Sequence, residues 1–227
     1  MTPSFTPHLE ILPPAQQRLW PELSAVTRLG WVLYGGTAVA LRLGHRFSVD
    51  FDFFTDKPLD KQALITALPL IGESTVLQDQ PEAFTVLVGR DGMPNAYVKL
   101  SFFGTLDFGR IGEPQMTEDG VLQVAALDDL MATKLKVLLQ RIEAKDYQDI
   151  AAMIKAGVSL ASGLAAARAL YGASFQPSES LKALVYFEGG DLQTLVLEDK
   201  EALIKATSAV RDLPVVRTAA RELYVSV

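Results

Sequence analysis

The chain has no cysteine among its 227 residues, and it has only two histidines, His8 and His45. The lack of cysteine excludes disulfides, thiolate metal sites and a cysteine nucleophile. Two histidines are too few to build a histidine-rich zinc centre. Any bound metal would therefore need carboxylate ligands, which suit magnesium or manganese.

Long apolar runs and a basic excess are lacking as well. No stretch reaches the roughly 18 apolar residues of a membrane-spanning helix, and the first residues have neither the basic nor the apolar region of a secretory signal. We therefore expect a cytoplasmic protein without a membrane partner. The formal net charge of −6 argues against a protein that coats nucleic acid non-specifically, although it leaves room for a local basic groove.

The spacing of apolar residues changes near residue 125. Upstream, runs of strand formers alternate with turns, and we predict strands at 30–34, 47–54, 75–77, 83–89 and 96–103. Short helices are predicted at 37–43 and 59–68, and a hairpin-type turn at 90–92. The first thirty residues fit either a helix or a loosely ordered arm, and 104–120 is predicted to be a long loop.

Downstream of residue 125, apolar residues recur at helical intervals. The first predicted helix buries the stripe Leu127, Leu130, Met131, Leu135 and Leu138. Asp128 is its predicted N-cap, and a second helix is predicted at 146–156. The pattern thus predicts an α/β domain over residues 1–125, followed by a helical domain over residues 126–227.

Asp50 and Asp52 lie two residues apart in a predicted strand. Because side chains alternate along a strand, both carboxylates share one face about 6–7 Å apart, whereas Val49, Phe51 and Phe53 occupy the other, buried face. Like charges this close repel each other unless a cation lies between them. A divalent ion bound by both carboxylates is the economical explanation. For an isolated pair of this kind, a solvated polar face is the alternative.

Gly35, Gly36 and Thr37 precede this pair and separate a predicted strand from a predicted helix. Glycines allow the backbone to approach a ligand closely, and free N–H groups at the start of a helix bind anions. Thr37 adds a hydroxyl. A tight turn that needs positive φ would explain the glycines alone. Together with the carboxylate pair on the next strand, however, the turn predicts phosphate and metal in one place.

Residues 35–54 (GGTAVALRLGHRFSVDFDFF) resemble the signature of the AbiEii/AbiGii family. Members are nucleotidyltransferase-like proteins of the superfamily that includes polymerase β, and many are toxins of type IV toxin–antitoxin pairs. The resemblance continues through 98–103 (VKLSFF), 129–135 (DLMATKL) and 145–149 (KDYQD), and so covers roughly residues 30 to 155. It implies the polymerase β-like mixed sheet with flanking helices for the first domain.

The resemblance also implies roles for later residues. Lys99 and Ser101 share the polar face of a predicted strand, where related enzymes carry a third metal-binding carboxylate and this chain has Ser101. Lys99 is expected to bind the nucleotide, or else to be a surface lysine. Lys134, at the edge of the buried stripe, is expected to stabilise the triphosphate.

Three further residues complete the expected site. Asp146 and Asp149 share one face of the second predicted helix, with Asp149 catalytic and Asp146 either nucleotide-binding or an N-cap. Arg46, which clusters with Arg42 and His45 before the aspartate strand, is expected to hold phosphate or to pair with an aspartate as scaffolding.

The resemblance implies a magnesium- or manganese-dependent transferase that moves a nucleoside monophosphate from a nucleoside triphosphate to an acceptor hydroxyl. It offers the 3′ end of a tRNA or another RNA as acceptor, with a protein acceptor left open, and a cognate antitoxin as partner. Because Ser101 replaces a carboxylate, a catalytically silent module that binds nucleotide or a partner is the alternative. A metal-dependent phosphoesterase is a weaker one, because it usually needs more acidic or histidine ligands.

Overall fold

The computed structural model describes residues 3–89 and 97–226 and divides the chain into two compact units. Unit 1 comprises Met1–Gly109, Glu113–Ala125 and Arg221–Val227; unit 2 comprises Arg110–Gly112 and Ala126–Ala220. The division after Ala125 falls where the sequence pattern changes, but residues 110–112 and 221–227 each belong to the unit opposite to the one predicted for them. The turn predicted at 90–92 lies outside the described residues.

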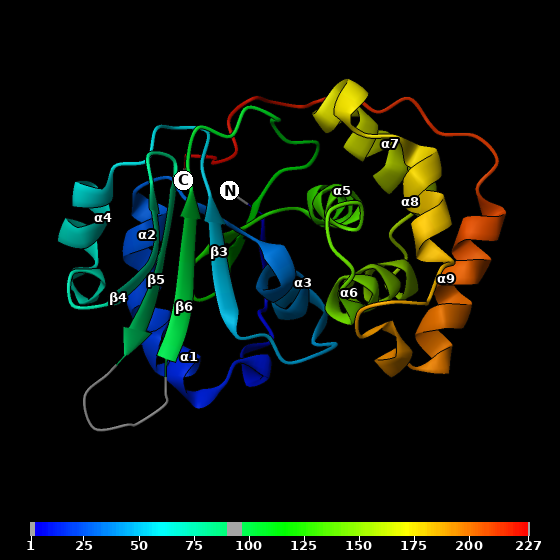
Figure 1. Cartoon of the computed structure of the whole chain (residues 1–227). Coiled ribbons are helices and arrows are strands. Elements are labelled where there is room, and N and C mark those ends of the chain that lie inside the picture. The colour runs from blue at the N-terminus through cyan, green and yellow to red at the C-terminus, as the bar shows by residue number, and fades with distance from the viewer. Residues whose placement is uncertain (1–2, 90–96, 227) are drawn as a thin grey trace. The chain divides into compact units, whose positions relative to one another are not determined.

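Within the described residues, unit 1 contains an eight-stranded sheet in the order β1-β7-β8-β2-β3-β6-β5-β4 (Figure 1). The strands are β1 (Ser4–Phe5), β2 (Val32–Tyr34), β3 (Asp50–Phe54), β4 (Thr75–Gln80), β5 (Ala83–Gly89), β6 (Tyr97–Phe103), β7 (Gln115–Thr117) and β8 (Gln123–Val124). β3 runs parallel to β6 and antiparallel to β2. The predicted mixed sheet with flanking helices is thereby confirmed.

The helices of unit 1 are α1 (Pro14–Leu19), α2 (Ser24–Arg28), α3 (Gly35–Leu43) and α4 (Lys61–Ala67). The first thirty residues are therefore largely helical. α3 ends at Leu43, and the following Gly44, with a φ of 63°, forms a left-handed C-cap. Asp60 begins α4 as its N-cap, because its carboxylate accepts a 2.9 Å hydrogen bond from the N–H of Ala63. None of the described helices is long and apolar enough to cross a membrane.

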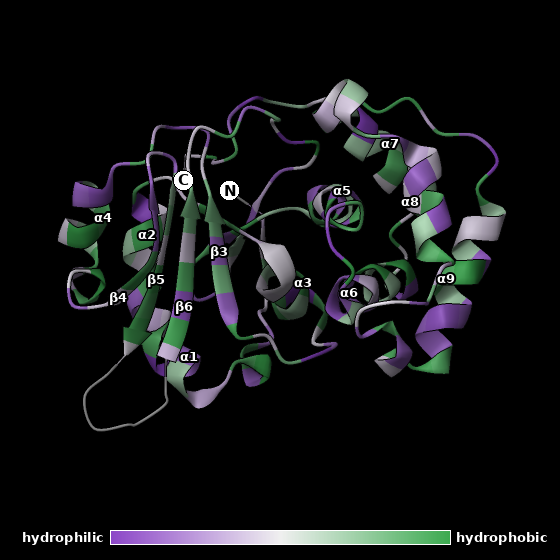
Figure 2. Cartoon of the chain, in the orientation of Figure 1, coloured by the Kyte–Doolittle hydropathy of each residue, from purple (hydrophilic) through white to green (hydrophobic). Residues whose placement is uncertain are grey.

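One face of the sheet forms the core of unit 1. Phe51 and Phe53 of β3, together with Phe102 of β6, are fully buried, and the rings of Phe53 and Phe102 stack with centroids 5.3 Å apart. Figure 1 shows α1 and α2 behind β5 and β6, and Figure 2 shows how hydrophobic these strands are. Burying each such side chain stabilises the fold by about 1.5–3 kcal/mol.

Val49 is not part of this core, contrary to the prediction that it shares the buried face. It is 60% exposed, because β3 begins only at Asp50 and residues 45–49 form the loop that leads into it. Alternation of side chains therefore does not apply to Val49.

Arg42 of α3 stabilises a part of the sheet that the sequence did not predict. Its guanidinium donates to the carbonyl oxygens of Ala125 (2.8 Å) and Val124 (2.9 Å) and to Oε1 of Gln115 (2.5 Å). Burial lowers its pKa to about 10. Arg42 thus connects α3 to β7 and β8, instead of joining Arg46 at the loop before β3. β7 falls within the segment predicted to be a long loop.

The last described residues return to unit 1. The N–H of Leu223 donates to the Asp56 carboxylate at 2.9 Å, and the side-chain amide of Gln123 exchanges two 2.9 Å hydrogen bonds with the backbone of Val225. Leu223 is fully buried. These contacts explain why residues 221–227 are not part of the helical unit.

Unit 2 contains α5 (Leu127–Val137), α6 (Ala144–Lys155), α7 (Leu160–Tyr171), α8 (Pro177–Leu184) and α9 (Leu197–Ala209). α5 and α7 cross closely, because a Cβ placed on Gly163 would lie 2.2 Å from the Met131 side chain. The N-cap of α5 is Ala126, not Asp128 as predicted. The neighbouring Asp129 accepts hydrogen bonds from the N–H groups of Ile111 (2.7 Å) and Gly112 (2.9 Å), which holds this segment to α5.

Asp129 makes the stability of the protein depend on pH. Burial raises its pKa from 3.8 to about 6, although the two backbone N–H groups partly oppose this shift. Between these values the folded state binds more protons than the unfolded state, so the free energy of unfolding should fall as pH rises, by at most about 3 kcal/mol. Urea denaturation of the wild type and of Asp129→Asn from pH 4 to pH 7 checks this. In Asp129→Asn the free energy of unfolding should fall less as pH rises. The same pH dependence in both proteins would contradict the raised pKa of Asp129.

Candidate active site

The candidate site lies on the face of the sheet opposite the core. The strand register places Asp50 beside Lys99, Asp52 beside Ser101, and Phe54 beside Phe103. In neighbouring strands such partners point to the same face. All except Ser101 are partly exposed, and Figure 2 shows hydrophilic stretches within the otherwise hydrophobic β3 and β6. The two predicted metal ligands therefore project from an accessible face.

Gly35 lies directly against one of these ligands. Its φ is 72°, and a Cβ placed on it would lie only 2.4 Å from Oδ2 of Asp52. Any other residue would clash with the carboxylate and strain the backbone. Gly35 is also the first residue of α3, whose N-cap Tyr34 caps no N–H with its side chain. Asp52 therefore lies at the positive end of a helix, where backbone N–H groups bind anions.

Thr37 has a different orientation from the one predicted. Its side chain is buried, and its hydroxyl bonds to the Ser48 hydroxyl (2.7 Å) and to the Asp50 carbonyl oxygen. The hydroxyl is thus directed inward, away from any phosphate on the surface. Its structural effect is to fix the backbone of Asp50 against α3. The backbone N–H of Thr37 is then the group that would serve a phosphate.

An aromatic cluster fixes the far end of this face. The Tyr34 ring stacks on Phe54 with centroids 4.7 Å apart and planes 14° apart, and Phe108 contacts both rings edge-on at 6.3 Å. Because Tyr34 pairs with Asp52 across β2 and β3, these contacts also hold the backbone that carries Asp52 and Gly35.

Lys99 forms an ion pair with Asp50. Its Nζ lies 2.7 Å from Oδ2 of Asp50, and the two side chains are 35% and 31% exposed. The two predicted metal ligands therefore have different surroundings. Asp50 is bound to an ammonium, whereas Asp52 lies against the start of α3. Both environments compensate negative charge on the face.

The donor set fits a magnesium or manganese ion only in part. Asp50 and Asp52 supply the carboxylate oxygens that these hard cations prefer, but Ser101 beside Asp52 adds no charge. In residues 3–89 and 97–226, no group of three or more histidine, cysteine, aspartate or glutamate side chains is placed to hold a metal ion. The residues therefore fit an ion that takes its other ligands from phosphate oxygens and water.

Arg46 lies in the loop that leads into β3. It is partly exposed, and its guanidinium donates a 2.9 Å hydrogen bond to the carbonyl oxygen of Phe47. The adjacent Phe47 and Val49 are exposed, whereas Ser48 between them is buried against Thr37. Arg46 is thus near Asp50 in the chain, as predicted, while its role in binding phosphate stays a prediction.

The remaining predicted residues form a buried ion cluster in unit 2. Nζ of Lys134 lies 2.7 Å from Asp146 and 2.6 Å from Asp149, and the three side chains are 6%, 0% and 0% exposed. Arg141 adds a two-pronged contact to Asp146 at 2.8 and 3.1 Å. Burial alone would raise the pKa of Asp146, but Arg141 and Lys134 outweigh it and lower the pKa.

One prediction about this cluster was wrong in placement, and one alternative is excluded. Lys134 does not lie at the exposed edge of the buried stripe of α5. It is buried between α5 and α6, where its ammonium binds the two carboxylates of α6. Asp146 is not the N-cap of α6, since that position belongs to Glu143. Sequence reasoning also missed Arg141. The signal for it was available: two aspartates on one helix face need more than one cation if they are buried.

Residues 23–221 match the family described as nucleotidyl transferase AbiEii toxin, type IV toxin–antitoxin system. An uncharacterised protein of Aquifex aeolicus (strain VF5) is 32% identical over 186 residues, which cover 79% of this chain and 85% of that protein. The chain belongs to the AbiEii family of nucleotidyltransferase toxins.

Among solved structures, MenT4, a nucleotidyltransferase toxin from Mycobacterium tuberculosis H37Rv, is similar with a TM-score of 0.58. The match covers 87% of this chain and 84% of MenT4 at 13% identity, and it therefore supports the fold. The prediction of an AbiEii-type nucleotidyltransferase is confirmed at the level of family and fold.

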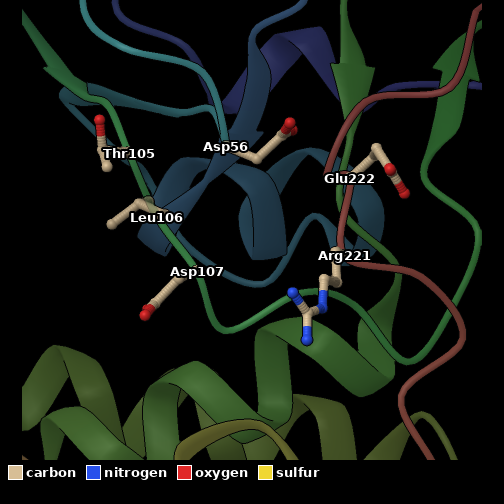
Figure 3. A pocket seen from close by; sticks show the side chains of 6 residues that line it. All are labelled: Asp56, Thr105, Leu106, Asp107, Arg221 and Glu222. Carbon is tan, nitrogen blue, oxygen red and sulfur yellow. The ribbon is translucent and has the colours of Figure 1, made fainter.

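A pocket of about 250 Å³ in unit 1 contains none of the predicted site residues of this AbiEii-family chain. Figure 3 shows its lining side chains: Asp56, Thr105, Leu106, Asp107, Arg221 and Glu222. It forms where the C-terminal segment meets the loops that follow β3 and β6. We assign it to the attachment of that segment, because Asp56 binds the backbone of Leu223.

Lys134→Ala should lower the free energy of unfolding. Removing the ammonium leaves Asp149 without this partner in the interior, and breaking a buried ion pair in this way costs about 3–5 kcal/mol. Lys136→Ala is the matched control on the same helix: its Nζ donates to Ser174 at the surface and lies 5.7 Å from the centre of the Tyr171 ring, and each contact is worth at most about 1 kcal/mol. Urea denaturation of both variants checks this. Equal, small losses would contradict the buried cluster.

Proposed function

We propose that the protein is a metal-dependent nucleotidyltransferase that moves a nucleoside monophosphate from a nucleoside triphosphate to an acceptor hydroxyl. The observation that carries this is the placement of Asp50 and Asp52 on an accessible face, with Asp52 against the first residue of α3. Carboxylates for a cation and backbone N–H groups for an anion thus lie side by side. A metal-bound nucleoside triphosphate needs both.

Each site residue has a defined task in this proposal. Asp50 and Asp52 would hold magnesium or manganese, which supplies Lewis-acid polarisation of the phosphoryl oxygens. The backbone at Gly35, Gly36 and Thr37 binds phosphate oxygens at the start of α3. Arg46 and Lys99 add positive charge, which an acidic chain with a pI near 5.0 needs wherever it binds a polyanion.

The helical unit is included through its buried cluster. We propose that Lys134 and Asp149 are catalytic residues and that Asp146 supports nucleotide binding, as the family resemblance implies. Because Asp146 has two cationic partners, it fixes the cluster, and Asp149 contacts the ammonium of Lys134. Charge-conserving variants, such as Asp149→Glu, are suited to test these roles because they retain compensation for Lys134.

The acceptor we propose is RNA, with the 3′ end of a tRNA as the first candidate. This rests on the family, and a protein acceptor is the competing possibility. We further propose that the protein acts in the cytoplasm as the toxin of a pair with a cognate antitoxin. Induced expression should then arrest growth, and the loss of Asp50 and Asp52 should abolish the arrest.

Replacing Asp50 and Asp52 together by Asn should lower the rate of nucleotidyl transfer by roughly 100-fold or more. The loss of a single preorganised charge-stabilising group already lowers a catalytic rate by about this factor. Both side chains are partly exposed, so the fold should persist. The assay incubates the protein with each labelled nucleoside triphosphate, magnesium and total RNA. Asp79→Asn, on the exposed strand β4, is the control. Full transfer by the double variant would refute the site.

A catalytically silent module that binds nucleotide is the second candidate, favoured by Ser101 beside Asp52. Two carboxylates bind a metal ion only weakly. A protein with such a site can bind a nucleotide without transferring any part of it. Tight nucleotide binding by the wild type, with no label transferred to any RNA or protein, would support this candidate.

Ser101→Asp tests how much the missing carboxylate matters. A third carboxylate beside Asp52 should tighten magnesium binding in the absence of nucleotide by about tenfold, because ligand charge sets the affinity of such sites. Ser101→Ala should leave it unchanged. Calorimetric titration with magnesium measures both. An unchanged affinity in Ser101→Asp would mean that the metal is not held between β3 and β6.

A further inference from the structure

The ion pair between Lys99 and Asp50 competes with the metal that the proposed function requires. Nζ of Lys99 lies 2.7 Å from Oδ2 of Asp50, which is hydrogen-bonding distance between full charges. An ammonium and a divalent cation cannot both take that oxygen at short range without strong repulsion. A metal ion bound at this oxygen would therefore displace Lys99.

We propose that Lys99 is an exchangeable counter-ion: it holds Asp50 when the site is without metal and moves to the triphosphate when metal and nucleotide bind. This rests on the proposed function and adds the order in which charges are exchanged. The phosphate oxygens that complete the shell of the ion lie within reach of a lysine on the neighbouring strand, because Asp50 and Lys99 are register partners.

Lys99 has the physical properties that such an exchange needs. Its side chain is 35% exposed, so the ammonium can change partners without opening the core. A lysine is a compact charge on a flexible stem, and an exposed ion pair of this kind contributes little to stability. Lys134 differs on each point, since it is buried between two carboxylates.

The exchange makes metal and nucleotide binding interdependent. Metal alone must displace Lys99 and gains only two carboxylates, so it binds weakly. Triphosphate alone meets an ammonium that is already paired. When both bind, the metal takes Asp50 and the phosphate takes Lys99, so each ligand strengthens the other by the same factor.

Lys99→Met provides the test, because it removes the charge and keeps the length of the side chain. Manganese binding is measured by calorimetry without and with inorganic tripolyphosphate, a probe that needs no nucleobase. Manganese alone should bind about tenfold more tightly to Lys99→Met than to the wild type, and tripolyphosphate should enhance it less, by a similar factor. Without metal, the thermal midpoint of the variant at low salt should fall, since Asp50 loses the ammonium that offsets its repulsion from Asp52.

Lys61→Met is the matched control, because Lys61 forms an ion pair with Asp79 on the same unit and away from β3. It should leave manganese binding unchanged, and Lys99→Arg should retain part of the coupling. Unchanged or weaker manganese binding by Lys99→Met overturns the exchange. If Asp50→Asn and Asp52→Asn weaken manganese binding in the same titration, the proposed function survives that result. If the wild type binds no manganese with or without tripolyphosphate, both proposals fail.

Discussion

Asp50 and Asp52 place two like charges on one face of one strand, and their neighbours are arranged around the repulsion between them. Lys99 binds Asp50 from the adjacent strand, and the start of α3 lies against Asp52. Thr37 ties the backbone of Asp50 to α3, while the stacked rings of Tyr34 and Phe54 hold β2 to β3. Gly35, Thr37 and Lys99 thus each contact one of the two aspartates and together hold the two carboxylates close to each other on this face.

Unit 2 contains a second pair of carboxylates and compensates them in another way. Asp146 and Asp149 are fully buried and share the ammonium of Lys134, with Arg141 completing the charge balance. Two acids and two bases give a cluster that is neutral as a whole, which is the condition for keeping charges in an interior. The same residue types thus form an open pair in one unit and a closed network in the other.

Much of the fold could be predicted from the sequence, because β3, β5 and β6 have strong apolar alternation and α5 to α6 have a clear helical period. The strands β1, β7 and β8 were missed because they are two or three residues long and depend on distant partners such as Arg42. The sequence pattern also did not predict that residues 221–227 belong to unit 1, because this depends on contacts with the distant Asp56 and Gln123.

For the site, spacing predicted that Asp50 and Asp52 share a face and that a helix follows the turn at Gly35 and Gly36, although the helix itself begins at Gly35 and not at residue 37. It could not predict that a Cβ on Gly35 would meet Asp52, because this depends on how β2 and β3 pair. The inward direction of the Thr37 hydroxyl and the burial of Lys134 were missed for a related reason. A polar side chain is buried when a hydrogen-bonding or charged partner lies in the interior. Here the partners are Ser48 and the two aspartates of α6, which lie on other elements and so cannot be inferred from local spacing.

The two lysines differ in what a ligand can do to them. An anion that approaches Lys99 competes with one partly exposed carboxylate, and a cation that approaches Asp50 competes with one partly exposed ammonium, so both exchanges cost little. An anion that approaches Lys134 would have to break contacts with two buried carboxylates, and each of these would lose a charge partner in a medium where that loss is expensive. Binding of metal and nucleotide can therefore rearrange charges around Asp50. The Lys134 cluster keeps its geometry through such an exchange, so any contribution it makes to catalysis comes from groups held in fixed positions.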